Sequence, residues 1–152
     1  MMSSPSASQS ASGSTVPSAR EGVPTPLYRK LGIKEGARVK VVGAPASFAG
    51  TLGDLPAGVE LVPRARSRVN VAVIFVTSLA ELERRFPPAH AALEKDGGLW
   101  VAWPKKSSSV ATDLDFERVQ GYGLRRGLVD NKVCAVDETF TALRFVYRLS
   151  DR

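Results

Sequence analysis

The sequence predicts a single α/β domain, a Rossmann-like three-layer sandwich with a mostly parallel sheet and a C-terminal antiparallel hairpin. One observation is the segment 69–76, which is almost entirely β-branched or apolar, as in a strand covered by helices on both faces. Another is the alternation along the chain of strand-like segments with segments of helical apolar spacing, which is typical of parallel sheets. A length of 152 residues with 43% apolar residues is enough for one sizeable core.

The domain is expected to span residues 25–152 and to follow a disordered tail, residues 1–24. The tail contains eight serines and three prolines and has no Leu, Ile, Phe, Tyr or Trp, so it cannot bury enough apolar surface to fold. Its first basic residue is Arg20, which does not fit the basic start of a signal peptide. The tail holds one Arg and one Glu, so the net charge of +6 belongs to the folded part.

The first half of the domain is predicted to contain two short helices and three strands. Thr25 offers a capping hydroxyl before Pro26, and the helix that they begin should end at Gly32. The expected strands are 38–42, 59–62 and 69–76, with a brief helix at 47–52. If the first and third strands are neighbours, the complete strand order should be 2-1-3-4-6-5.

The second half is predicted to contain helices and strands in alternation and then a hairpin. Ser78 and Glu81 have the spacing of a capping box, and the helix that follows should break or kink at Pro87-Pro88. A second helical piece, 89–95, should end at Gly97-Gly98. A strand is expected at 99–103, with Trp100 and Trp103 on opposite faces. The next helix should be capped by Thr112 or Asp113 and should turn Phe116, Val119 and Leu124 inward. Antiparallel strands are expected at 132–136 and 142–148.

Three segments, 26–33, 98–106 and 127–137, resemble the bacterial family catalogued as domain of unknown function 3052. Its most specific pieces here are Trp-Pro-Lys-Lys at 103–106 and Asp-Asn-Lys-Val-Cys at 130–134. The resemblance covers residues 25–149. It implies a bacterial, cytoplasmic origin and a compact α/β fold, and it carries no functional residue over to this chain.

Several common chemistries are disfavoured, and neither a cofactor nor a metal is expected. A dinucleotide fingerprint needs three glycines, but the turn at 43–48 reads Gly-Ala-Pro-Ala-Ser-Phe, and Pro45 removes a backbone donor. The ribose-binding carboxylate expected about 20 residues later is also missing. Cys134 and His90 are the single Cys and His of the sequence and cannot fill four zinc positions; Cys134 is expected to be a small buried apolar group.

The best candidate site is a basic loop that should follow a central strand. Lys105, Lys106, Ser107 and Ser108 precede a capped helix whose free amide groups favour anions. Lys132 is expected to add positive charge if the fold brings it close, as are Arg64 and Arg66.

The leading hypothesis is a non-catalytic binding module whose ligand or partner is an anion bound at this loop, with an anionic small molecule as the candidate. The alternative is a small enzyme acting on a phosphorylated or nucleotide-like substrate at the same end of the sheet, and a second alternative is weak nucleic-acid binding. An enzyme should place a carboxylate such as Asp113 or Asp137 near the lysines in a concave pocket. The longest apolar run, 71–76, is far shorter than the ~20 residues of a membrane-spanning helix, so no membrane association is expected. Cys134 has no partner for an intrachain disulfide, so a reducing compartment, the cytoplasm, is the predicted location.

Overall fold

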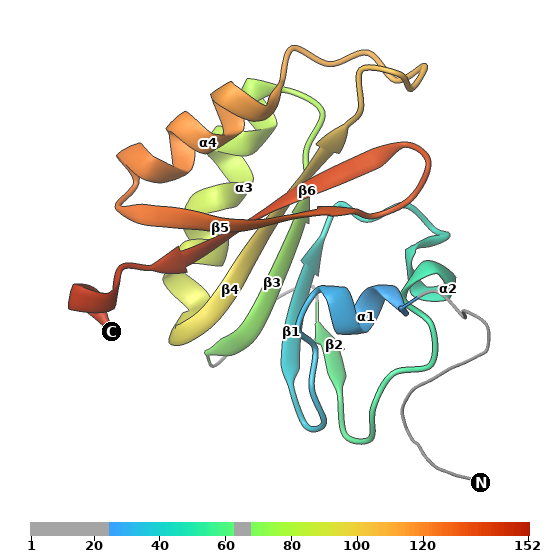
Figure 1. Cartoon of the computed structure of the whole chain (residues 1–152), viewed down its shortest axis with the longest axis vertical. Coiled ribbons are helices and arrows are strands. Elements are labelled where there is room, and N and C mark those ends of the chain that lie inside the picture. The colour runs from blue at the N-terminus through green and yellow to red at the C-terminus, as the bar shows by residue number, and fades with distance from the viewer. Residues whose placement is uncertain (1–24, 63–67) are drawn as a thin grey trace, which may run out of the picture.

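The computed structural model describes residues 25–62 and 68–152, which form an α/β structure around one six-stranded sheet (Figure 1). The expected tail and the loop residues Arg64 and Arg66 lie outside the described residues. The strands are β1 (Arg38–Val42), β2 (Glu60–Val62), β3 (Val69–Phe75), β4 (Leu93–Pro104), β5 (Leu128–Ala135) and β6 (Phe140–Tyr147). The helices are α1 (Leu27–Lys30), α2 (Phe48–Leu52), α3 (Leu79–Ala92), α4 (Phe116–Arg125) and the terminal 3-10 turn η1 (Leu149–Asp151).

The strand order is β2-β1-β3-β4-β6-β5, which is the order predicted from the sequence. Strand β1 is parallel to both β2 and β3, and β3 is parallel to β4. Strand β6 is antiparallel to β4 and to β5, so the expected C-terminal hairpin is confirmed. The carboxyl ends of β1 to β4 therefore meet at one edge of the sheet, and their amino ends meet at the opposite edge.

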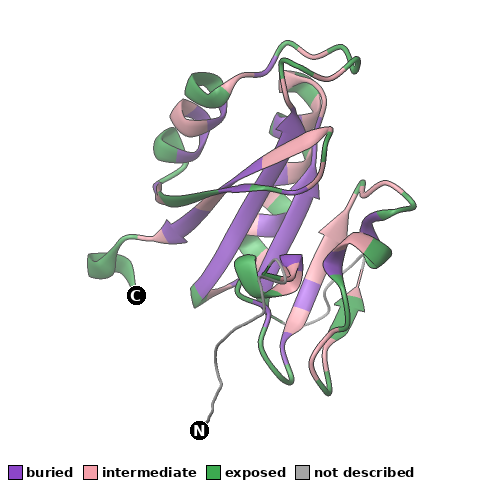
Figure 2. Cartoon of the chain, turned by 45° about the vertical axis from the view of Figure 1, so that its right-hand side comes forward, coloured by how far each residue is buried: buried purple, intermediate pink, exposed green. Residues whose placement is uncertain are grey.

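Helices cover both faces of the sheet, and each face has its own apolar core (Figure 1). Phe86 of α3 and Val119 of α4 belong to one cluster, whereas Leu31 after α1 and Leu52 of α2 belong to the other. Figure 2 shows that β3 and most of β4 are buried along their length, as the apolar segment 69–76 predicted. Trp100 and Trp103 lie in different clusters, which confirms that they face opposite ways.

The segment between residues 87 and 98 differs from the prediction. Helix α3 continues through Pro87-Pro88, because Phe86 and Ala89 on either side are both fully buried against the sheet. Strand β4 then begins at Leu93, where a helix was expected up to residue 95. Gly97-Gly98 do not end an element but lie inside β4. Glycine is needed at 97 because a side chain there would collide with the carbonyl oxygen of Asn70 on β3.

Three of the expected helix details are also wrong. Pro26 takes the N-cap position of α1, and no side chain caps this helix, so Thr25 has no capping role. Helix α4 begins later than expected, because Asp115 caps it by accepting a 2.9 Å hydrogen bond from the amide of Arg118. Phe116 and Leu124 are each 39% exposed, whereas Val119 is buried as predicted, together with Tyr122 and Gly123.

Candidate functional site

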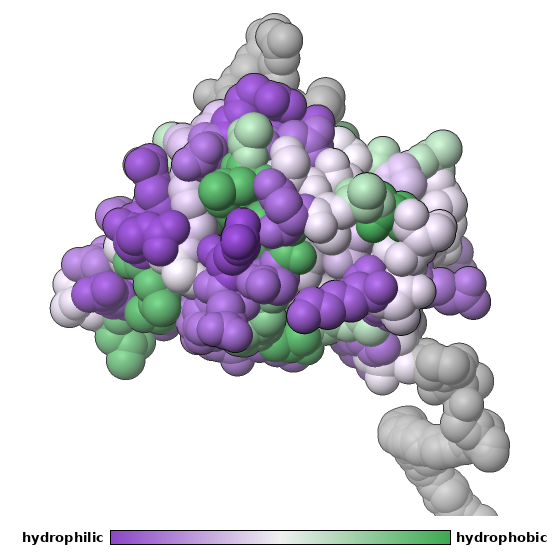
Figure 3. All heavy atoms as spheres, turned by 90° about the horizontal axis from the view of Figure 1, so that it is seen from above, coloured by the Kyte–Doolittle hydropathy of each residue, from purple (hydrophilic) through white to green (hydrophobic). Residues whose placement is uncertain are grey.

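The predicted basic loop follows β4 and lines an open hollow at the carboxyl edge of the sheet. This hollow has a volume of about 500 Å³ and is lined by Lys105, Lys106, Ser108, Ser109, Val110, Ala111, Thr112, Asp113, Leu114, Asp115 and Arg118. Figure 3 views the molecule toward this edge and shows a mainly hydrophilic surface with separate apolar patches. We call this feature the lysine-loop hollow.

Part of the loop serves the fold itself. The ammonium group of Lys105 donates a 2.7 Å hydrogen bond to the carbonyl oxygen of Asp137, and the Lys105 amide donates to the carbonyl oxygen of Thr139 at 2.8 Å. The hydroxyl of Ser108 donates to the Lys105 carbonyl at 2.8 Å. The carboxylate of Asp137 accepts bonds from the amides of Thr139 and Phe140 and so stabilises the turn of the hairpin. Lys105, Ser108 and Asp137 thus have structural partners.

Other charged groups of the lysine-loop hollow have capacity left for a ligand. Within the described part of the chain, neither the ammonium of Lys106 nor the guanidinium of Arg118 makes a hydrogen bond or an ion pair. One oxygen of Asp113 accepts a 2.9 Å bond from the amide of Leu79 at the start of α3, which leaves its second oxygen free for another donor. The hollow therefore combines two available cations with a partly available carboxylate.

The structure brings four of the five predicted site residues together and separates the fifth. Lys105, Lys106, Ser107 and Ser108 share one loop, in which Lys106 and Ser107 are exposed. Lys132 does not line the lysine-loop hollow; its ammonium lies 3.4 Å from the carbonyl oxygen of Lys30 at the end of α1. In the β5–β6 ladder Lys132 pairs with Arg144, so both side chains lie on the face that carries α1.

The point where the strand order reverses, between β1 and β3, is occupied by a side chain. The guanidinium of Arg85 donates to the carbonyl oxygen of Phe75, and a Cβ placed on Gly43 would overlap that guanidinium. Glu81 lies 3.5 Å from Arg85, and the hydrogen bond from the Thr77 amide lowers the pKa of the Glu81 carboxyl. Open α/β sheets commonly bind nucleotides at such a reversal, and here Arg85 fills it.

A second pocket, which was not predicted from the sequence, lies at the amino ends of β1, β3 and β4. It has a volume of about 400 Å³, and its charged lining residues are Lys34, Glu35, Asp96 and Arg144. Arg144 lies in the predicted strand 142–148, and its place in that strand carries no sign of a pocket. A clue in the sequence was Gly97-Gly98, because paired glycines in a strand indicate close approach of another group.

His90 and Cys134 occupy separate places and form no pair. His90 lies between the rings of Phe86 and Tyr147, at centroid distances of 5.9 and 5.4 Å, and burial followed by the charges of Arg126 and Lys95 lowers its pKa. Cys134 is buried in the cluster on the α1 face, and burial raises the pKa of its thiol. Across residues 25–62 and 68–152, no group of three or more His, Cys, Asp or Glu side chains could hold a metal ion. No helix in these same ranges has the length and apolar character needed to cross a membrane.

Comparison with known proteins gives matches among solved structures. No protein-family model matches the chain, and no curated protein matches it. A structure described as LepI in complex with SAM aligns with a TM-score of 0.43 and 11% identity, over 80% of this chain and 39% of that one. A structure of a single-residue variant of LepI in complex with SAH and a substrate analogue aligns with a TM-score of 0.42 and 12% identity, again over 80% and 39%. The chain thus spans about two fifths of the length of the proteins that it matches.

The expectation of a non-catalytic module that binds an anion through the basic loop is corrected by these observations. That expectation finds no counterpart in the two matched structures, which hold SAM or SAH and, in one case, a substrate analogue. The physical reason for the correction lies in the loop. The ammonium of Lys105 is already hydrogen-bonded to the carbonyl oxygen of Asp137, and the cations of the loop share the hollow with the carboxylate of Asp113.

Proposed function

We propose that this chain is a small enzyme of Rossmann-like architecture that acts on a phosphorylated or nucleotide-like substrate at the lysine-loop hollow. The observation that carries the proposal is the presence of Lys106, Arg118 and Asp113 in one hollow beyond the carboxyl end of β4. Ligands of open α/β sheets bind beyond this edge. Membership of the bacterial family that the sequence resembles is part of the same proposal.

The charged groups of the hollow divide into two roles. Lys106 and Arg118 have no competing carboxylate within 4.0 Å in the described part of the chain, so they are available to hold the oxygens of a phosphate. Asp113 keeps one oxygen on the Leu79 amide, which fixes the orientation of the carboxylate. Its other oxygen then takes a proton from a substrate hydroxyl or from water, as a general base. The neighbouring Ser107 and Ser108 hydroxyls supply further hydrogen-bonding capacity in the same loop.

The proposed substrate position lies away from the point between β1 and β3 where the strand order reverses. Arg85 fills that position and donates to the Phe75 carbonyl oxygen, so a ligand in the usual nucleotide position would have to displace it. SAM belongs in the test because one of the two matched structures holds SAM and the other holds SAH.

The test is a turnover screen read by ³¹P NMR and mass spectrometry, with nucleotides, sugar phosphates and SAM as substrates. Asp113→Asn should lower turnover at least about tenfold because the amide retains the bond to Leu79 but cannot accept a proton. Lys106→Ala should instead raise KM. The matched control is Asp54→Asn, an exposed carboxylate in the loop between α2 and β2, which should leave turnover unchanged. Absence of turnover by the wild-type protein across the screen, or equal loss in the Asp54 and Asp113 variants, would contradict the proposal.

A further inference from the structure

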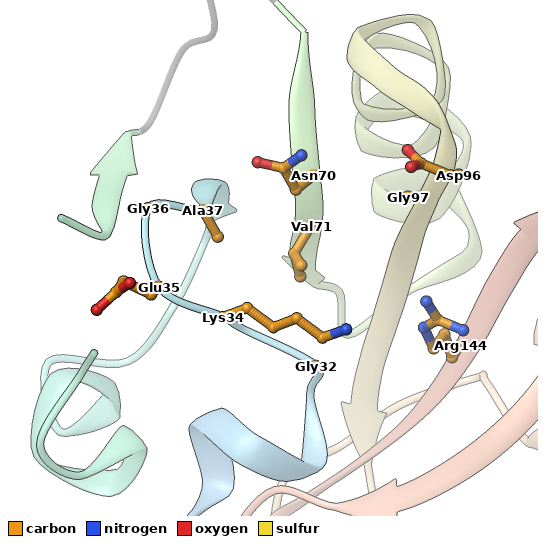
Figure 4. A pocket seen from close by; sticks show the side chains of 10 residues that line it. All are labelled: Gly32, Lys34, Glu35, Gly36, Ala37, Asn70, Val71, Asp96, Gly97 and Arg144. Carbon is orange, nitrogen blue, oxygen red and sulfur yellow. The ribbon is translucent and has the colours of Figure 1, made fainter. Parts of the chain in front are cut away.

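The pocket at the amino edge of the sheet is built by segments that are far apart in the sequence. Its wall on one side is the loop 32–37 between α1 and β1, and on the other side it is formed by the starts of β3 and β4 together with β6 (Figure 4). It holds about 400 Å³, enough for a small metabolite. We call it the amino-edge pocket.

Arg144 is the most unusual group in this pocket. Its side chain is half-buried, yet its guanidinium makes no hydrogen bond or ion pair within the described part of the chain. Burial, reinforced by the like charge of Arg152, lowers the pKa of Arg144, although an arginine stays protonated at neutral pH. A partly desolvated cation without a partner is unfavourable, so such a group is expected to meet an anion from outside the chain.

The guanidinium also packs closely against the sheet. A Cβ on Gly98 would overlap the Nε and Cζ atoms of Arg144, so the planar group lies directly against the backbone of β4. Trp100 is the residue of β4 that pairs with Arg144, and it is fully buried. The planar fork of a guanidinium matches the two oxygens of a carboxylate or phosphate.

A second cation reaches the same space. The side chain of Lys34 extends from its loop toward β3 and β4, whereas the carboxylate of the neighbouring Glu35 points away from the strands (Figure 4). Lys34 makes no ion pair with a described residue, and Asp96, an exposed residue of the pocket lining, lies beyond 4.0 Å from both cations. Lys132 adds positive charge on the same face of the sheet.

We propose that the amino-edge pocket binds a small molecule through its oxyanion group, a carboxylate or a phosphate, which Arg144 contacts with two nitrogens and Lys34 with its ammonium. This site lies at the opposite edge of the sheet from the lysine-loop hollow, so the inference goes beyond the proposed function and does not depend on it.

The test measures binding of four probes to the full chain by isothermal titration at constant ionic strength. Inorganic phosphate and pyrophosphate represent the phosphate source, and acetate and citrate represent the carboxylate source. At least one probe should bind and raise the melting temperature. Arg144→Gln should weaken that binding roughly tenfold or more, because it removes charge-assisted hydrogen bonds. Lys34→Ala should weaken it by a smaller factor.

Matched controls separate this pocket from other basic surfaces. Arg125→Gln removes an exposed arginine of α4 and should not change the affinity at the amino-edge pocket. Lys106→Ala removes a cation that the proposed function assigns to phosphate binding in the lysine-loop hollow, so this variant reports on the hollow and not on the amino-edge pocket. Arg144→Lys keeps the charge and the stem but loses the fork, so it should fold and still bind weakly. Lys34→Ala alters only an exposed loop and keeps the test valid if Arg144→Gln is unfolded.

Three outcomes would overturn the inference. The first is that none of the four probes binds the wild-type protein. The second is that binding persists unchanged in both the Lys34 and the Arg144→Lys variants. The third is an equal loss in the Arg125 control. A loss confined to Lys106→Ala would support the proposed function and reject the anion site at the amino edge.

Discussion

The indole nitrogen of Trp100 donates a buried hydrogen bond of 3.0 Å to the carbonyl oxygen of Leu31, which lies 69 residues earlier. Leu31 is the C-cap of α1, a helix of only four residues that could not persist without tertiary contacts. The bond joins this helix to the central strand β4. It also fixes the start of the loop 32–37, which forms one wall of the amino-edge pocket.

Replacement of Trp100 by Phe should lower the free energy of unfolding by about 1–3 kcal/mol through the lost hydrogen bond, because the Leu31 carbonyl stays buried without its partner. The smaller ring adds a packing loss. Trp103→Phe is the matched control, because Trp103 is also buried in β4 but its indole nitrogen has no partner among the described residues. Urea denaturation should show a larger loss for Trp100→Phe. Equal losses would mean that the bond to Leu31 contributes nothing.

Two glycines of α4 should respond to alanine in opposite directions. A Cβ at Gly123 would overlap the ring of Phe145, which is fully buried in β6, whereas a Cβ at Gly121 would meet only the flexible end of Arg125 at 3.2 Å. Alanine favours a helix over glycine by about 1 kcal/mol, but overpacking a core costs about 1–3 kcal/mol. Gly121→Ala should therefore stabilise the protein slightly in thermal unfolding, and Gly123→Ala should destabilise it. Stabilisation by both variants would show that Phe145 moves aside without cost.

The strands could be predicted because their apolar character is local to the sequence. The segment 69–76 contains almost only β-branched and apolar residues, and it became the buried strand β3. The pair Gly97-Gly98 misled the prediction, because local preference treats glycines as a stop. Their real role depends on Asn70 and Arg144, which approach them from other strands.

The candidate sites were predictable only where they depend on local sequence. The loop with Lys105 and Lys106 could be placed at the carboxyl edge, because the strand before it was recognisable. The position of Lys132 could not be predicted, because it depends on the β5–β6 register, which shifts between Asp130 and Lys132. The amino-edge pocket was missed because Lys34 and Arg144 meet only through the fold.

Gly43→Ala should be more damaging than an alanine at another glycine with the same backbone conformation. Gly43 has φ of 73° and Gly36 has φ of 75°, so alanine costs about 1–2 kcal/mol at either position. A Cβ at Gly36 meets nothing within 4 Å, whereas a Cβ at Gly43 overlaps the Arg85 guanidinium. The excess loss for Gly43→Ala in urea denaturation measures that overlap.

A double variant isolates the contribution of Arg85 to this effect. If the guanidinium is the obstacle, Gly43→Ala should cost less in an Arg85→Ala background than in the wild-type protein. Strict additivity of the two changes would show that the obstacle is the backbone near Phe75, whose carbonyl oxygen is the other close neighbour of Gly43.

Protonation of His90 should destabilise the protein as the pH falls. Burial is the largest cause that lowers the pKa of His90, followed by the positive charges of Arg126 and Lys95, while its ring contacts Phe86 and Tyr147. Between this lowered pKa and the ordinary value of 6.5, the unfolded chain binds a proton that the folded chain does not. The contribution of His90 to stability is therefore fully present above about pH 6.5 and declines as the pH falls below it. Urea denaturation should be measured between about pH 7.5 and 5.5, a range set around that ordinary value. The free energy of unfolding should decline more steeply for the wild-type protein than for His90→Gln, which has no titrating ring. Parallel declines would show that His90 is protonated equally in the folded and unfolded states.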